Sequence, residues 1–276
     1  MQLLGHQTLR VSATTEVTRL TQLLDVVIAI DMSGSMANGV GGGVKRIDAA
    51  RDAAKILVGI LFGEDAIKDK LKIGLVPWNG KVNITLNGTA FDSTETTTSV
   101  VNAFTNPLTG LVQNEVFIPN NSPVALLSAP PANWEGCVYS RYLDNADDSD
   151  DADVILADHL TALGDWVAWE PVGPEGEPFP GATLCTSAVG NHECRPCLDH
   201  GITPLQSTRT TIDDAIDELV NPEGVTNITQ GLAWAWRVLS PPAPFTEADA
   251  NPPGRRQQTL ILLTDGENFA GSGDGY

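Results

Sequence analysis

The stretch Val26-Val27-Ile28-Ala29-Ile30-Asp31-Met32-Ser33-Gly34-Ser35 decides the fold that this sequence predicts. Its first five residues are apolar without interruption, which is typical of a strand buried on both faces of a parallel sheet. Asp31, Ser33 and Ser35 follow this run, so we expect their side chains at the carboxyl end of the strand. Open α/β sheets bind ligands at that edge. Carboxylate and hydroxyl oxygens suit Mg²⁺, Mn²⁺ or Ca²⁺.

Two later stretches carry side chains of the same kind. Gly224-Val225-Thr226-Asn227-Ile228 places a threonine hydroxyl just before a predicted helix. Thr259-Leu260-Ile261-Leu262-Leu263-Thr264-Asp265-Gly266 is a second apolar strand, and it also ends in an aspartate. For the isolated first motif, a role in capping the next helix and bonding backbone donors stays open. The two later stretches favour a metal site.

Together the three segments resemble the metal-ion-dependent adhesion site (MIDAS) of von Willebrand factor A (VWA) domains. Matched residue by residue, the resemblance assigns the site to Asp31, Ser33, Ser35, Thr226 and Asp265. It implies that the three hydroxyls bind a divalent cation directly or through water, while the two carboxylates act mostly through water and hold the hydroxyls in place. Mg²⁺ is the expected ion, with Mn²⁺ or Ca²⁺ as alternatives. One coordination position would stay open for a carboxylate of a partner protein.

Two further segments resemble the TadG-like proteins of bacterial tight-adherence (Flp pilus) assembly systems. They are Trp134-Glu135-Gly136-Cys137-Val138-Tyr139-Ser140-Arg141 and residues 226–241, where Ala235 stands in place of the usual glycine. The resemblance covers about residues 20–276. It implies an extracytoplasmic binding module, not an enzyme, with pilus-assembly components as partners. TadG-like proteins carry an N-terminal membrane anchor, so membrane attachment is expected only through an anchor absent from this chain.

The predicted fold class is α/β, with a doubly wound, mostly parallel sheet and helices on both faces, Rossmann-like as in VWA domains. Residues 1–24 are interpreted as an N-terminal arm and 25–105 as the first part of the VWA domain. Residues 106–206 are interpreted as an insertion and 207–276 as the second part of the domain. The family has two more strands than this chain, so we expect a truncated domain whose strand 258–264 lies at a sheet edge.

Hydrophobic spacing predicts three amphipathic helices, at about 45–62, 211–220 and 228–239. In the third, Leu232 and Trp236 are expected on the same face as the helix's last leucine. These helices are expected to cover the sheet.

The same reading predicts strands at 71–77 and 81–86, joined as an antiparallel hairpin by a turn that contains Asn79-Gly80. Residues 92–105 are predicted to form a short helix. The long segment that follows shows no regular alternation of helix and strand, which favours an insertion over a connecting loop.

All the cysteines lie in the predicted insertion: Cys137, Cys185, Cys194 and Cys197. An even number in a loop-rich region predicts two disulfides in an oxidising compartment, and the sequence leaves all three pairings open. A zinc site and free thiols are the alternatives, since His192 and His200 flank the Cys194-x-x-Cys197 motif. Four ligands so close in sequence would crowd a tetrahedral site. The acidic run 144–153 lacks the glycine and glutamate of an EF-hand and is interpreted as a solvated loop.

The charge balance limits the class of partner. The 276 residues include 35 acidic and 16 basic side chains, a net charge of -19. This excess argues against nucleic acid and against anionic lipid, which both require basic side chains. Two other functions remain as alternatives: a metal-assisted hydrolase with Glu267 as the nearest candidate base, and a structural scaffold with an unused metal site.

Overall fold

The apolar stretch before Asp31 forms β1 (Gln22–Asp31), which is buried continuously from residue 25 to residue 31. It pairs in parallel with β4 (Leu71–Trp78) on one side and with β12 (Arg255–Leu263) on the other. β11 (Thr203–Gln206) pairs antiparallel with β4. The main sheet therefore has the order β11-β4-β1-β12 and is mixed, with three parallel strands and one antiparallel edge. The predicted strands at 71–77 and 258–264 are confirmed.

The structure is a computed structural model. It describes residues 22–95, 97–105, 112–126, 128–132, 134–138, 168–169, 171–172, 197–241, 244–252, 254–266 and 268. Within these ranges, none of the helices has the length and apolar character that crossing a membrane requires. The acidic run 144–153 lies outside the described residues.

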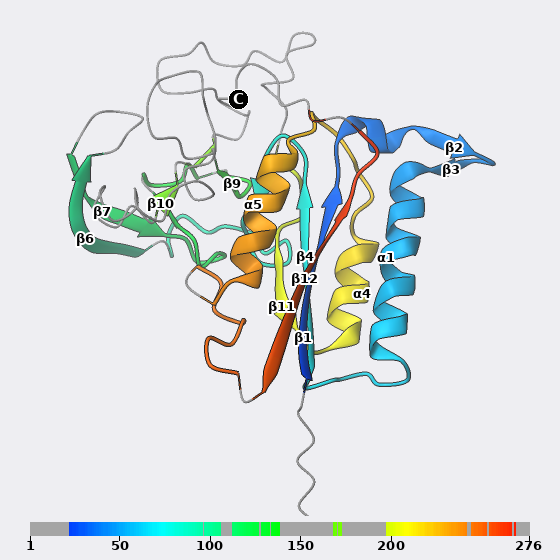
Figure 1. The fold of residues 1–276 in the computed structure, drawn as a ribbon. Helices are drawn as coiled ribbons and strands as arrows, with labels where there is room; N and C mark the ends of the chain where they lie inside the picture. Colours follow the sequence, from blue (N-terminus) through cyan, green and yellow to red (C-terminus); the bar gives the residue numbers. More distant parts are fainter. Residues whose placement is uncertain are drawn as a thin grey trace, which may run out of the picture.

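Helices pack on both faces of the main sheet (Figure 1). α1 (Arg46–Phe62) and α4 (Arg209–Asp217) share one buried cluster with Ile28 of β1. α5 (Ile228–Leu239) shares the opposite cluster with Val27. Alternate residues of β1 thus enter two separate cores, as the two-residue period of a strand requires. All three predicted helices are confirmed, with α4 beginning and ending slightly earlier than predicted.

A second sheet lies on the α5 side of the main sheet, in the order β10-β8-β7-β6 (Figure 1). Its strands are β6 (Thr97–Thr105), β7 (Val112–Ile118), β8 (Ala125–Leu126) and β10 (Ala168–Trp169). The predicted helix at 92–105 is therefore wrong, because the threonines and valines of this segment favour extended backbone. The ring centroids of Trp169 and Trp234 are 5.1 Å apart, so the second sheet packs against α5.

The predicted hairpin between 71–77 and 81–86 is also wrong. Only β5 (Val82–Asn83) is a strand there, and it pairs with β9 (Cys137–Val138) instead of β4. The antiparallel neighbour of β4 is β11, although the predicted boundaries placed these residues in the insertion. Pairing with segments distant in sequence therefore outweighed the preference of Asn79-Gly80 for a hairpin turn.

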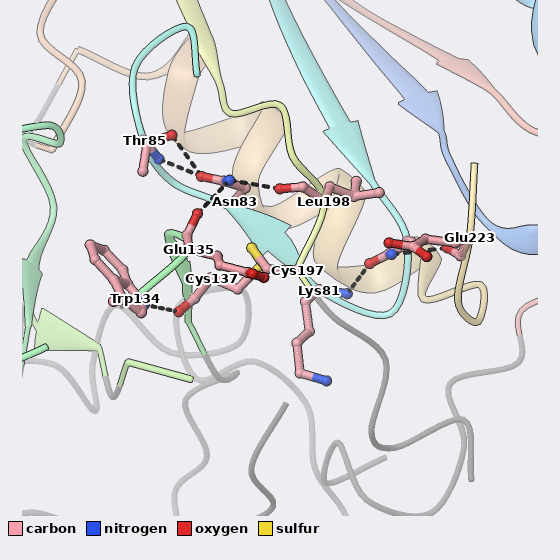
Figure 2. Close-up of a disulfide and its surroundings, with 10 residues drawn as sticks. Lys81, Asn83, Thr85, Trp134, Glu135, Cys137, Cys197, Leu198 and Glu223 are labelled. Carbon is pink, nitrogen blue, oxygen red and sulfur yellow. Dashed lines mark hydrogen bonds between the residues drawn. A yellow bond between two sulfur atoms is a disulfide. The ribbon is translucent and has the colours of Figure 1, made fainter. Parts of the chain in front are cut away.

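A disulfide joins Cys137 of β9 to Cys197, across 60 residues of sequence (Figure 2). Beside it, the side-chain amide of Asn83 donates to the carbonyls of Glu135 and Leu198, at 2.8 and 2.7 Å. The amide and the disulfide thus tie the same two segments together. One of the two predicted disulfides is confirmed.

The zinc alternative fails at Cys197, whose sulfur is in the disulfide. His200 Nδ1 instead lies 2.8 Å from a carboxylate oxygen of Glu218. Cys185, Cys194 and the other flanking histidine lie outside the described residues.

α5 lies close against the sheet at Gly231. A Cβ atom there would lie 2.6 Å from two ring atoms of Trp78, whose side chain is fully buried. The predicted apolar face is wrong at Leu232 and Trp236, which are 38% and 63% exposed. The helix is instead buried through Trp234, the alanines on either side of it, Val238 and Leu239, and Gly231 leaves room for the Trp78 ring.

We expect loss of the disulfide to destabilise the protein. Under the chain-entropy model, a crosslink across 60 residues stabilises by roughly 4 kcal/mol, so a Cys137→Ala/Cys197→Ala double variant should lose up to about that much unfolding free energy in urea. In dithiothreitol, wild type and the double variant should unfold at similar urea concentrations. An oxidised wild type no more stable than the double variant would contradict the expectation.

Alanine substitutions at two helical glycines should change the free energy of unfolding in opposite directions. Gly231→Ala forces a methyl group into the Trp78 ring and should cost about 2–3 kcal/mol. Gly59→Ala, within α1, meets only the end of the Arg209 side chain at 3.4 Å and should gain about 0.5–1 kcal/mol from helix propensity. Urea unfolding of both variants checks this, and equal changes in stability would contradict the close approach of α5 to the sheet.

Candidate functional site

The site lies where β1 and β12 end side by side. Their parallel register pairs Ile30 with Leu263, so the chain leaves both strands at the same edge of the sheet (Figure 1). Asp31 is the last residue of β1, and Asp265 follows β12 by two residues. After β1 the chain turns into the short 3-10 helix η1 (Gly34–Ala37). This turn brings two serine hydroxyls back over the strand ends.

A continuous chain of hydrogen bonds joins the two aspartates through the two serines. The backbone N–H of Ser33 donates to Asp31 Oδ1 at 2.7 Å. The hydroxyl oxygens of Ser33 and Ser35 are 3.1 Å apart. The Ser35 hydroxyl then donates to Asp265 Oδ1 at 2.7 Å. Four of the five predicted site residues are thus in direct contact.

Thr226 comes from the loop before α5. A Cβ atom built at Gly266 would lie 3.7 Å from Ser35 Oγ and 3.9 Å from Thr226 Oγ1, so both hydroxyls lie within 4 Å of one point. The loop is held in place by the Gly34 N–H, which donates to the Gly224 carbonyl at 3.0 Å. The Thr226 hydroxyl therefore lies near Ser35 and the other three predicted residues, without a hydrogen bond to them in the described contacts.

The site is buried and acidic. Asp31 and Ser33 are 0% and 1% exposed, and Thr226 is 7% exposed. Burial raises the pKa of Asp31 above its ordinary value, hydrogen bonds from Thr264 and Ser33 oppose this rise, and the charge of Asp265 adds to it. A bound cation would relieve both the desolvation and the repulsion between the carboxylates.

Sequence reasoning missed two residues that contact the site. The Thr264 hydroxyl donates to Asp31 Oδ2 at 2.7 Å, across the pairing of β1 with β12. Arg46, the first residue of α1, forms an ion pair with Asp265 Oδ2. The sequence could have indicated Thr264, because it directly precedes a site aspartate at the end of a strand. Nothing in the sequence indicates that the Arg46 side chain points toward the site.

The residues present fit a hard divalent cation. They offer three hydroxyl and two carboxylate groups, and oxygen donors of this kind suit Mg²⁺, Mn²⁺ and Ca²⁺. Across the described part of the chain, no group of three or more His, Cys, Asp or Glu side chains is placed to hold a metal. Cation binding at this site would therefore depend on the hydroxyls. The candidate base Glu267 lies outside the described residues.

No protein-family model, curated protein or solved structure matches the chain. The resemblance to VWA domains and to TadG-like proteins therefore stays a prediction that rests on the quoted residues and on the geometry above.

The Thr264 hydroxyl should stabilise the buried Asp31 carboxylate. Thr264→Val removes this donor and should cost about 1.5 kcal/mol, the usual contribution of a hydrogen bond to a charged group. Thr264→Ser keeps the hydroxyl and serves as the matched control. Urea unfolding in EDTA should rank wild type above the serine variant and the valine variant last. Equal stability of the two variants would contradict this role.

Proposed function

We propose that the chain is a metal-ion-dependent protein-binding module in which Asp31, Ser33, Ser35, Thr226 and Asp265 hold a divalent cation, Mg²⁺ before Mn²⁺ or Ca²⁺. One observation carries the proposal. Hydroxyls and carboxylates from three distant segments converge at the carboxyl ends of two parallel strands, the edge where open α/β sheets bind ligands.

The five residues of the proposed site have two different roles. In the proposed site, Ser33, Ser35 and Thr226 would contribute hydroxyl oxygens to the cation, and the two aspartates would hold the serines in place and supply negative charge. When bound, a divalent cation supplies a positive centre that attracts an incoming anion. A carboxylate of a partner protein is the ligand that this chemistry favours.

The finer assignment follows from the resemblance. We propose a doubly wound VWA domain of the TadG-like kind, outside the cytoplasm, that contacts pilus-assembly components. The helices on both faces of the main sheet support the fold proposal. The Cys137–Cys197 disulfide supports an oxidising compartment.

The two alternatives predict different outcomes for the same protein. A metal-assisted hydrolase would need a general base, and its candidate Glu267 lies outside the described residues, so no observation favours it. A scaffold with an unused site would keep its partner after loss of the metal ligands.

Cation-dependent stabilisation tests the proposed function. At about one hundred times its dissociation constant, Mg²⁺ should add roughly 2.7 kcal/mol of unfolding free energy to wild type relative to EDTA. Thr226→Val removes one hydroxyl ligand with little change in shape, and Asp31→Ala removes a carboxylate, so both should lose most of this gain. Thermal melts with EDTA, Mg²⁺, Mn²⁺ and Ca²⁺ measure it.

The control is Asp52→Ala, which removes an exposed carboxylate from α1 and should keep the full cation response. If the melting temperature of wild type is the same in EDTA and in all three cations, the proposed function is contradicted. An equal response in wild type and both site variants would mean that the cation binds elsewhere.

A further inference from the structure

Arg46 places a permanent positive charge on the proposed cation site. It follows directly on the hairpin of β2 (Gly39–Gly41) and β3 (Val44–Lys45) and begins α1. Its backbone N–H donates to the Asn38 carbonyl at 2.9 Å, which fixes the start of the helix beside the site. Its guanidinium reaches Asp265 Oδ2.

The two oxygens of Asp265 are thereby both engaged. Oδ1 accepts from the Ser35 hydroxyl, and Oδ2 accepts from Arg46. Asp31, the second carboxylate, is bonded instead to the Ser33 N–H and the Thr264 hydroxyl, which carry no charge. The guanidinium thus supplies charge compensation at a point where two carboxylates repel each other.

We propose that Arg46 is an internal competitor for the divalent cation, and that it sets the cation concentration at which the site fills. The inference rests on the proposed function. A divalent metal ion that contacts Ser35 and Asp265 lies close to the Arg46 guanidinium and repels it. The metal ion and the guanidinium therefore compete for the same carboxylate. Filling the site then requires Arg46 to weaken or release its bond to Asp265.

The position of Arg46 allows that release. Its side chain is 38% exposed, whereas that of Asp265 is 12% exposed. A guanidinium at the surface regains water when it leaves its partner, so hydration offsets part of the lost attraction to Asp265. The carboxylate, by contrast, stays in place because Ser35 still holds its other oxygen.

Arg46→Gln tests the competition directly. With the competing charge removed, we expect the variant to bind Mg²⁺ and Mn²⁺ about tenfold more tightly than wild type by isothermal titration calorimetry, within the usual range of coupling between two sites. Arg46→Lys keeps the charge and should bind close to wild type. Arg51→Gln is the matched control, because Arg51 lies on the same helix but pairs with Asp217 at 3.2 Å, away from the site.

A second readout uses the metal-free protein. In EDTA, Arg46→Gln should melt below wild type, because the two carboxylates lose their compensating charge, and added Mg²⁺ should remove the difference. Arg51→Gln should show the same deficit with and without Mg²⁺. A deficit of Arg46→Gln that Mg²⁺ leaves unchanged would mark an ordinary structural ion pair and overturn the inference.

The outcomes separate the inference from the function it rests on. If wild type binds the cation and Arg46→Gln binds it equally or more weakly, the competition is wrong and the proposed function stands. If neither protein binds any of the cations, both are wrong. If Arg46→Lys binds as tightly as Arg46→Gln, charge is not the operative property, and the inference is overturned.

Discussion

The parallel pairing of β1 with β12 is the constraint on which the rest of the site depends. It aligns Ile30 with Leu263, so both strands end together and their aspartates meet. Ser35 and Asp265 are 230 residues apart in sequence, yet their side chains share a hydrogen bond of 2.7 Å. A slip of one residue would turn the side chains of a whole strand to the opposite face and break this contact. The apolar packing of β1 in two cores therefore fixes the geometry of polar groups at its end.

Burial of a carboxylate at that position has a cost that the surrounding donors offset. Asp31 is fully buried, and its two oxygens accept from a backbone N–H and from the Thr264 hydroxyl. Neutral donors satisfy its hydrogen bonds but leave its charge uncompensated, which is why burial raises its pKa. The only guanidinium that the described residues bring to this cluster, Arg46, lies on the other aspartate. The arrangement leaves a local excess of negative charge, which favours a cation.

The sequence predicted those parts in which local pattern and tertiary contact agree. The sequence indicated the apolar run of β1, the helical spacing of α1 and α5, and the residue types of the site. The hairpin at Asn79-Gly80, the helix at 92–105 and the buried face of α5 were not, because contacts distant in sequence decided them. Trp236 has the hydrophobicity of a core residue, but the close approach of Gly231 to Trp78 turns that face of the helix away from the sheet.

The contacts that Asn79 makes, in place of the predicted hairpin, explain how Thr226 is positioned. Asn79, expected in a tight turn, instead donates through its side chain to the Glu223 carbonyl at 2.9 Å, and its own carbonyl accepts from the Asn227 N–H at 2.9 Å. The Glu223 N–H donates to the Met32 carbonyl at 2.7 Å. The loop that carries the threonine hydroxyl is thus held at both ends by the segments that follow β4 and β1.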